Sequence, residues 1–226
     1  LKYHVFDKKN VTMADMLDTL AKNFKNNEAL WTRLIEDTPK YGNDDDYADD
    51  VMKAVFEAYF SVINDRPNAK GGVHRINLLP TTCHVYFGSV IGALPDGRKA
   101  GKPLSEGVSP VQGADRNGPT AVVKSLGKMD QVKSGGTLLN QRFLPDVLKT
   151  EQDLDKLVQL IRTYFRLNGH HIQFNIVDTE TLKKAQAAPD DYADLLVRVA
   201  GYSDYFVDLD EYHQQEIIER TTQKGF

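Results

Sequence analysis

Apolar residues recur at helical spacing in the first third of the chain. Thr12-Met13-Ala14-Asp15 has the pattern of a capping box, and the apolar residues after it predict a helix over residues 12–24. The polar stretch 41–46 is expected to be a loop that caps a second helix. This helix should end near Pro67, because proline disfavours helix at its predecessor. Its broad apolar face consists of Val51, Val55, Phe56, Tyr59, Phe60 and Ile63.

The last third of the chain alternates between helical and strand patterns. Apolar positions predict helices over residues 153–166, 179–187 and 210–222. Gly169 is expected to end the first of them, and Asp178 or Thr179 to cap the second. Residues 171–176 alternate between polar and apolar, and 195–199 are mostly apolar, so both segments are expected to be strands. Helices that alternate with buried strands favour parallel pairing, as in an α/β barrel or an open sheet.

The middle of the chain, residues 71–136, is rich in Gly, Pro, Ser and Asp. It is expected to hold two short strands, over residues 76–79 and 84–87, and a turn at Pro95-Asp96-Gly97-Arg98. Such a long loop-rich stretch is uncommon in a compact domain unless its loops are functional.

Composition changes this picture only by exclusion. The 226 residues are 41% hydrophobic and 27% charged, an ordinary globular balance. A formal net charge of −4 argues against a nucleic-acid binder. No apolar run has the length of a membrane span, and no signal-peptide pattern stands at the front. The lone Cys83 excludes an internal disulfide and favours a reducing, cytoplasmic setting. Because the chain starts at Leu1 rather than Met, it is expected to be a piece of something longer.

Two polar clusters invite a metal-site interpretation. Asp44, Asp45 and Asp46 lack the alternating ligand spacing of a calcium loop, so a solvated helix cap is favoured over a cation site. His170 and His171 are adjacent, and adjacent strand residues point to opposite faces. A structural or hydrogen-bonding role is favoured over metal ligation, and no metal site is predicted.

Three further features carry alternatives of their own. Cys83 has no histidine at a spacing typical of nucleophilic catalysis, and lone cysteines usually act as small buried hydrophobes. Gly135-Gly136-Thr137 matches neither of the common phosphate-loop patterns. Gly201, taken alone, indicates a tight turn after a strand in a plain structural α/β domain.

The surroundings of Gly201 change that interpretation. Arg198-Val199-Ala200-Gly201-Tyr202 resembles the signature of the glycyl radical enzyme family, which includes pyruvate formate-lyase. In that family the signature lies near the carboxy terminus, as it does in this chain. Other stretches resemble family segments in the family's order, which makes the match specific. They are residues 95–101, 107–110, 118–121, 136–140, 169–175 and 215–221.

This resemblance implies a fold and a stored radical. The chain would be the carboxy-terminal part of a ten-stranded α/β barrel, with residues 1–70 as a helical part and 71–226 as the glycine radical domain. Gly201 would store the radical on a central loop, with Arg198, Val199, Ala200 and Tyr202 as its neighbours. Glycine suits this role because a planar Cα radical delocalises over the amide nitrogen and the carbonyl, and because glycine allows backbone shapes that other residues avoid.

The resemblance also implies partners. A radical S-adenosylmethionine activating enzyme with an iron–sulfur cluster would remove a hydrogen atom from Gly201, and no other cofactor would be bound. The loop would have to come out for this step, and the closing segment 203–226 is expected to move with it. A homodimer is expected. The family passes the radical to a catalytic cysteine on an upstream loop, followed two residues later by a glutamate. Cys83 does not lie in such a loop, so that cysteine is expected in a missing amino-terminal part or another chain.

Two stretches resemble one branch of the family in particular. Residues 81–88 and 199–206 are most similar to the members that dehydrate trans-4-hydroxy-L-proline to 1-pyrroline-5-carboxylate. Thr81 or Thr82 would then line the substrate pocket, although strand threonines bonded to their own sheet remain the alternative. Glycerol or propanediol dehydratases, pyruvate formate-lyase-type members and a non-catalytic repair subunit stay open as alternatives.

Overall fold

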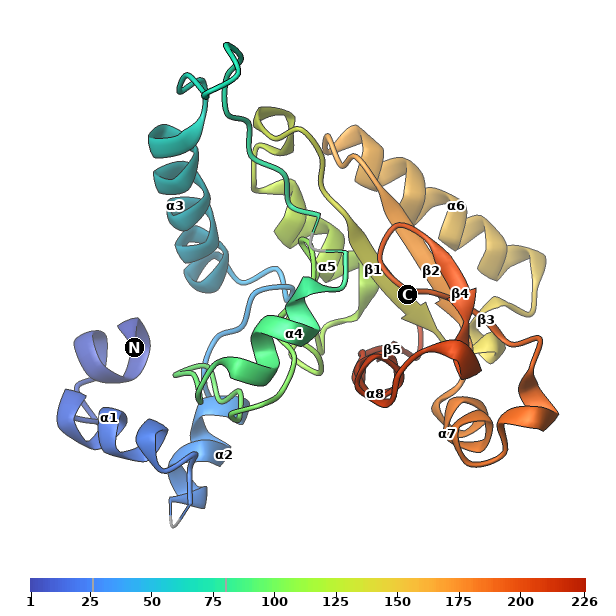
Figure 1. The fold of residues 1–226 in the computed structure, drawn as a ribbon, viewed down its shortest axis with the longest axis horizontal. Coiled ribbons are helices and arrows are strands. Elements are labelled where there is room, and N and C mark those ends of the chain that lie inside the picture. The colour runs from blue at the N-terminus through green and yellow to red at the C-terminus, as the bar shows by residue number, and fades with distance from the viewer. Residues whose placement is uncertain (26, 80) are drawn as a thin grey trace. The chain divides into compact units, whose positions relative to one another are not determined.

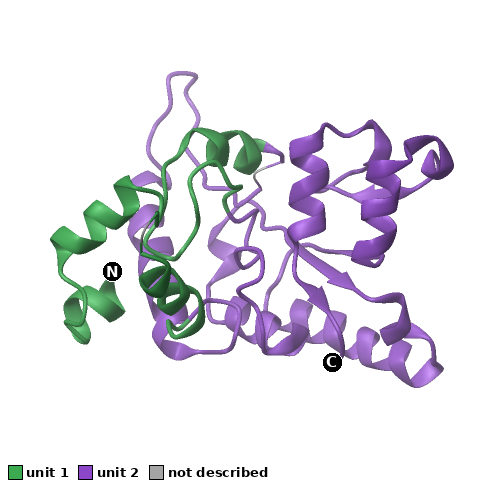
Figure 2. Cartoon of the chain, turned by 90° about the horizontal axis from the view of Figure 1, so that it is seen from below, with its two compact units in different colours: residues 1–39, 83–104 green, residues 40–82, 105–226 purple. Residues whose placement is uncertain are grey.

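A computed structural model describes residues 1–25, 27–79 and 81–226. The chain divides into two compact units, which Figure 2 distinguishes by colour. The first consists of Leu1–Pro39 and Cys83–Leu104, and the second of Lys40–Thr82 and Ser105–Phe226. Among the described residues, no helix is long and apolar enough to cross a membrane.

The first unit is helical. The hydroxyl of Thr12 accepts the Asp15 N–H at 3.0 Å, so the predicted capping interaction is confirmed. Buried apolar residues such as Met16 and Leu34 form a small core. The predicted turn is also confirmed, since Gly97 has a φ of +101° there. The helices of the first unit are a π-helical turn over Lys2–Asp7, α1 over Met13–Ala21, α2 over Glu28–Glu36 and α4 over Cys83–Val90.

The strand predicted over residues 84–87 is wrong, because this segment lies in α4. Its buried residues His84, Val85 and Gly88 share one helical face. Gly88 packs so closely on a neighbouring segment that a Cβ there would lie 2.4 Å from the Lys102 carbonyl oxygen. The run of aromatic and β-branched residues favours a strand locally, and this packing overrides it.

In the second unit, α3 spans Asp46–Ile63 and begins at a cap in the predicted loop. The Asp45 carboxylate accepts the N–H groups of Tyr47 and Ala48, at 2.9 and 3.4 Å, which confirms the predicted helix cap. Asp44 and Asp46 both pair with Lys128. Of the predicted apolar face, Phe56 is buried, whereas Val51, Val55 and Tyr59 are exposed.

A three-stranded parallel sheet lies at the centre of this unit, in the order β2-β1-β5. Figure 1 shows β1 and β2 side by side, with α5 and α6 close to them. Leu139 and Phe143 pack with Val122 and Leu126 of α5 and with Tyr164 of α6 in the main core. The elements are α5 over Gly118–Gly127, β1 over Leu139–Phe143, α6 over Glu151–Arg166, β2 over Ile172–Ile176 and β5 over Thr222–Gln223.

Three details differ from the sequence-based expectations. The left-handed residue after α6 is Asn168, at φ +63°, and Gly169 instead permits close packing, since its Cβ would lie 2.3 Å from the Tyr164 ring. Residues 76–79 form only an isolated bridge, between Leu78 and Thr137. The final helix is shorter, because α8 spans Glu211–Glu219 and the chain then enters β5.

The remaining elements form a second core beside the sheet. Helix α7 spans Thr179–Ala187, as predicted, and Asp178 caps it. Strands β3, over Leu196–Arg198, and β4, over Ser203–Tyr205, form an antiparallel hairpin. Val197 and Phe206 pack with Leu182 of α7 and Ile217 of α8. The expectation of parallel pairing is therefore confirmed for the sheet and wrong for β3.

Candidate functional site

Gly201 lies in the turn of the β3–β4 hairpin. Val199 donates its N–H to the Tyr202 carbonyl at 2.9 Å, so Ala200 and Gly201 form the tip. Gly201 has a φ of +87°, a conformation that glycine adopts at little cost. A Cβ at this position would lie 3.4 Å from Leu138 Cδ1, which is an ordinary contact distance. Backbone conformation, rather than lack of space, therefore favours glycine here.

The polar face of the parallel strands holds the backbone that leads to this tip. Asn140 on β1 and Gln173 on β2 are register partners, and Asn175 is two residues further along the same face of β2. The Asn175 amide accepts the Arg198 N–H and donates to the Arg198 carbonyl, both at 2.8 Å. Gln173 accepts the Gly201 N–H at 3.0 Å.

A buried ion pair from α8 reaches the same backbone. The guanidinium of Arg220 donates to the carbonyls of Arg198, at 3.2 Å, and Val199, at 2.9 Å. It also pairs with the Glu216 carboxylate, with a shortest contact of 2.7 Å. Burial alone would lower the pKa of Arg220, but the Glu216 and Glu106 carboxylates raise it. Arg220 is therefore a charged clamp that joins α8 to the hairpin.

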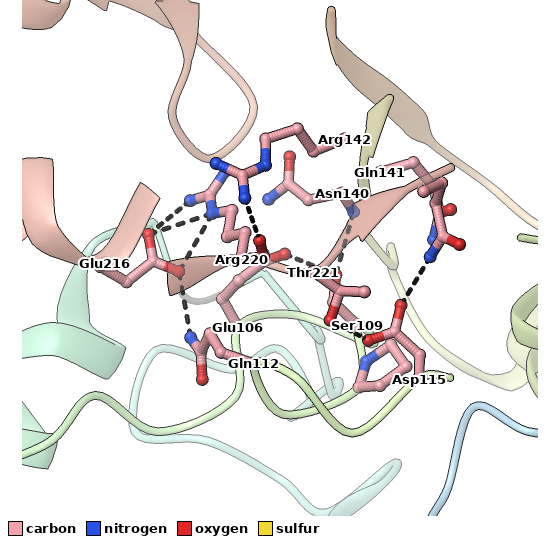
Figure 3. Close-up of a pocket in the computed structure, with 12 residues that line it drawn as sticks. Glu106, Ser109, Gln112, Asp115, Asn140, Gln141, Arg142, Glu216, Arg220 and Thr221 are labelled. Atoms are coloured by element: carbon pink, nitrogen blue, oxygen red, sulfur yellow. Dashed lines mark hydrogen bonds and ion pairs between the residues drawn. The ribbon is translucent and has the colours of Figure 1, made fainter. Parts of the chain in front are cut away.

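Beyond Arg220 lies a small polar cavity, whose lining Figure 3 shows. Glu106 is buried, and burial raises the pKa of its carboxyl, although Ser109 donates a hydrogen bond to it. Burial also raises the pKa of Asp115 to about 6, while hydrogen bonds from Thr221 and Gln223 oppose that rise. The cavity thus lies between the loop around residues 106–115 and the last strand of the sheet, and the hydrogen bonds of Asp115 connect the two.

The other residues singled out from the sequence do not hold the hairpin. Thr81 and Thr82 form a turn that leads to α4, and Thr81 has a φ of +54°, which is unusual for a β-branched residue. The alternative of strand threonines is therefore wrong. Cys83 is exposed as the first residue of α4, so the expectation of a small buried hydrophobe is wrong. The His171 carbonyl accepts hydrogen bonds from the backbone of Leu139 and the Tyr164 hydroxyl, which is a structural role.

Glycines 135 and 136 also have structural roles. Gly135 donates its N–H to the Ile76 carbonyl, and the Gly136 carbonyl accepts the Leu78 N–H, each at 2.8 Å. Within the described part of the chain, no group of three His, Cys, Asp or Glu side chains is arranged to hold a metal ion.

Most of the side chains that hold the hairpin backbone were not predicted from sequence. Asn140, Gln173 and Asn175 were noted only as parts of family-like stretches. The signal was nonetheless present, because polar side chains recur at two-residue spacing in buried strands, as in 173 and 175. Glu216 and Arg220 are likewise spaced as a helical i,i+4 pair.

Two known protein families match consecutive parts of the chain. The family described as "Pyruvate formate lyase-like" matches residues 1–88, and the family described as "Glycine radical" matches residues 104–207. The second range contains β1, β2 and the whole hairpin.

Curated relatives align with nearly the whole chain. It is 54% identical over 223 residues to trans-4-hydroxy-L-proline dehydratase from Clostridioides difficile, which covers 99% of this chain and 28% of the relative. The probable dehydratase YbiW from Escherichia coli is 42% identical, with 98% and 28% covered. Isethionate sulfite-lyase from Bilophila wadsworthia is 40% identical, with 98% and 27% covered.

Solved structures show the same relationship in space. The crystal structure of the C. difficile hydroxyproline dehydratase with trans-4-hydroxy-L-proline bound matches with a TM-score of 0.96, over 99% of this chain and 28% of that one. The B12-independent glycerol dehydratase from Clostridium butyricum, 44% identical, matches with a TM-score of 0.93, over 99% and 28%.

This chain belongs to the glycyl radical enzyme family. Its parallel sheet and helices correspond to the carboxy-terminal part of the family's α/β barrel, as the sequence predicted. The chain spans somewhat more than a quarter of the length of the relatives named above, between 27% and 28%.

The Arg220 clamp predicts a strongly unequal response to single and double substitution. Arg220→Met leaves Glu216 buried without its counter-ion, so it should lower the free energy of unfolding by about 3–5 kcal/mol. Adding Glu216→Gln should restore part of that loss. Thermal unfolding of the full-length protein measures both. Lys183→Met, which removes an exposed ion pair with Glu180, is the control and should cost about 1 kcal/mol or less. If the losses in unfolding free energy from Arg220→Met and Glu216→Gln simply added in the double variant, the two side chains would not act as a pair, which would contradict the clamp.

The raised pKa of Asp115 predicts a pH dependence with a definite sign. The folded protein holds a proton on Asp115 up to about pH 6, whereas the ordinary aspartate value is 3.8. Because the folded state binds the extra proton, stability should fall as pH rises between these values, by roughly 1–3 kcal/mol.

Asp115→Asn should remove this contribution. Amide hydrogen exchange of residues 221–223 should be measured in the full-length protein from pH 4 to pH 7. As pH rises, these amides should lose protection against exchange in wild type relative to the variant. A difference between the two proteins that does not change with pH would contradict the assignment to Asp115.

Proposed function

We propose that this chain is the radical-storing part of a glycyl radical dehydratase, and that Gly201 carries the radical. The observation that supports this most directly is the geometry of the tip. Gly201 sits at φ +87° in a two-residue turn. Buried polar side chains from β1, from β2 and from Arg220, which follows α8, hold the backbone on its amino-terminal side. The family-typical neighbours Arg198, Val199, Ala200 and Tyr202 surround it.

The chemistry of storage requires this kind of residue. Loss of a hydrogen atom from Cα leaves a radical that delocalises over the flanking amide nitrogen and carbonyl when the centre is planar. A side chain would crowd the planar centre and would disfavour positive φ. The short turn and the contacts at 198, 199 and 201 would hold that plane in a defined orientation.

Installation of the radical requires a second protein. A radical S-adenosylmethionine activating enzyme would take the hydrogen atom from Gly201, so the radical is a modification of the chain rather than a bound cofactor. The hairpin tip would have to become accessible, and Arg220 ties it to α8. We therefore propose that residues 203–226 move together with the tip.

Turnover requires a part of the enzyme that this chain does not supply. The stored radical would pass to a catalytic cysteine upstream, in the remaining part of the enzyme, and the whole enzyme would act as a cytoplasmic homodimer under anaerobic conditions. Cys83 is not assigned that role. Within the chain, residues 1–70 would complete the helical part of the barrel and 71–226 would form the glycine radical domain.

For the substrate, we propose trans-4-hydroxy-L-proline. Abstraction of a hydrogen atom from C5, loss of the C4 hydroxyl as water and return of the hydrogen atom to the product radical would yield 1-pyrroline-5-carboxylate. The support is the 54% identity to a hydroxyproline dehydratase over nearly the whole chain. Thr81 and Thr82 would contribute hydroxyls to the pocket, and the left-handed backbone of Thr81 suits a residue held in place for function.

A second candidate comes from the glycerol dehydratase likeness. That enzyme is 44% identical and matches with a TM-score of 0.93, so a diol dehydratase is the alternative. A non-catalytic repair subunit is a further alternative, and it predicts a natural reading frame without an upstream cysteine loop.

Gly201→Ala should abolish the radical. The full-length protein, activated anaerobically, should give a glycyl radical signal by electron paramagnetic resonance. The variant should give none, because the alanine methyl group crowds the planar centre and disfavours φ +87°. Air exposure should then cleave activated wild type at Gly201 and release the segment that follows it, as intact mass would show.

Gly225→Ala is the matched control, because a Cβ there would meet no atom within 4 Å. It should keep both the signal and the cleavage. An activated wild type that stays uncut in air would count against Gly201.

Substrate assignment rests on one assay. The activated full-length enzyme should convert trans-4-hydroxy-L-proline to 1-pyrroline-5-carboxylate, and Gly201→Ala should stop it. Parallel incubations with glycerol and propane-1,2-diol test the alternative. A protein that holds the radical but turns over only a diol would overturn the hydroxyproline proposal and leave radical storage intact.

A further inference from the structure

Gln173 makes a contact to the radical glycine that no other side chain named above makes. This glutamine lies on β2 with its side chain buried, and its Oε1 accepts the Gly201 N–H at 3.0 Å. The same oxygen accepts a hydrogen bond from the Arg198 guanidinium at 3.1 Å. One amide oxygen therefore joins the end of β3 to the turn.

The orientation of the Gln173 amide follows from its partners. Its Oε1 end faces two donors, the Gly201 N–H and the Arg198 guanidinium, neither of which can accept. Its Nε2 end faces the Val199 carbonyl oxygen at 3.4 Å and the side-chain oxygen of Asn140. A flipped amide would place an NH₂ group against two donors, so the network allows only one orientation.

We propose that Gln173 is a positioning residue for the radical glycine. This inference rests on the proposed function and deepens it. By holding the Gly201 N–H, the Gln173 oxygen sets the direction of the Cα–H bonds in the closed enzyme. It also sets the plane over which the unpaired electron spreads once a hydrogen atom is removed.

The same hydrogen bond acts as a latch. Whenever the tip leaves its site for the activating enzyme, the Gly201 N–H must separate from Gln173. A net hydrogen bond of ordinary strength changes such an equilibrium by roughly threefold to tenfold. Removal of the acceptor should therefore raise the population of the open tip by about that factor.

Asn175 offers a matched control on the same strand. Its amide also binds the hairpin, through the N–H and the carbonyl of Arg198, both at 2.8 Å. The glycine amide, however, is bound by Gln173 and not by Asn175. Asn175→Ala should therefore loosen β3 without releasing the Gly201 N–H directly.

Amide hydrogen exchange in the full-length, unactivated enzyme tests the latch without a radical or a substrate. With exchange resolved to single amides, Gln173→Met should speed exchange of the Gly201 N–H by roughly threefold to tenfold. Asn175→Ala should speed exchange at Arg198 and leave Gly201 within about twofold of wild type. Equal exchange at Gly201 in wild type and Gln173→Met, or equal acceleration by both variants, would overturn the proposal.

Protection in α6 reports whether Gln173→Met still folds. If α6 loses protection in that variant, Gln173→Asn replaces it, because the shorter amide withdraws its oxygen from Gly201 but keeps the polar group. Faster exchange at Gly201 in Gln173→Asn supports the latch, and wild-type exchange overturns it.

Electron paramagnetic resonance of the activated enzymes tests the positioning role separately. Gln173→Met should gain its radical faster than wild type and show an altered coupling to the remaining α-hydrogen, whereas Asn175→Ala should show the wild-type spectrum. An unchanged rate and spectrum in Gln173→Met would overturn the positioning role. Absence of a radical in wild type would instead contradict the proposed function.

Discussion

The structure of the site depends on how the short strand β3 satisfies its backbone. Along one edge, β3 pairs with β4. On the side of the sheet, side chains bond to the backbone of Arg198, the last residue of β3, and of Val199, which follows it. These side chains are Asn140, Gln173, Asn175 and Arg220. Buried backbone groups must be paired, and here side chains take the place of a neighbouring strand. A hairpin held in this way can separate from β2 without unzipping a continuous ladder, which suits the proposed access of an activating enzyme to the tip.

This arrangement places charged side chains in the interior, where they lose their hydration. Arg142 and Arg220 lie buried near the carboxylates of Glu106 and Glu216, and burial lowers the pKa of Arg142 to about 10. Buried ion pairs contribute little net stability, because desolvation offsets their attraction. Their value here is geometric, since Arg142 binds the α8 carbonyl of Ile217 at 3.1 Å while Arg220 binds the hairpin. While the tip is in its site, the charged network ties the hairpin and the last helix to the sheet.

Elements with a clear period were predictable, and elements defined by packing were not. Helices α1, α3, α6 and α7 and strand β2 lie where their apolar periods and caps predicted them. Helix α4 was mistaken for a strand because its buried face is set by the close approach of residues 102–104 to Gly88. Strand β1 was missed because it is buried throughout and does not alternate. A helical residue such as Val55 is apolar yet exposed, so an apolar stripe alone does not show what covers it.

The sequence by itself determined the family, and it indicated Gly201 as the glycine that we propose to store the radical, because the signature around Gly201 is contiguous and its chemistry depends on one residue type. The sequence also contained a spacing pattern for the side chains that hold the hairpin. Gln173 and Asn175 are two residues apart on a strand, and Glu216 and Arg220 are four residues apart at helical spacing. Only the tertiary structure decided that these side chains meet at one hairpin tip. Asn140, Gln173 and Arg220 are far apart along the chain, and their convergence depends on the parallel register of β1 and β2 and on the return of α8. Local periodicity records which way a side chain points from its own element, whereas its partner depends on the path of the whole chain.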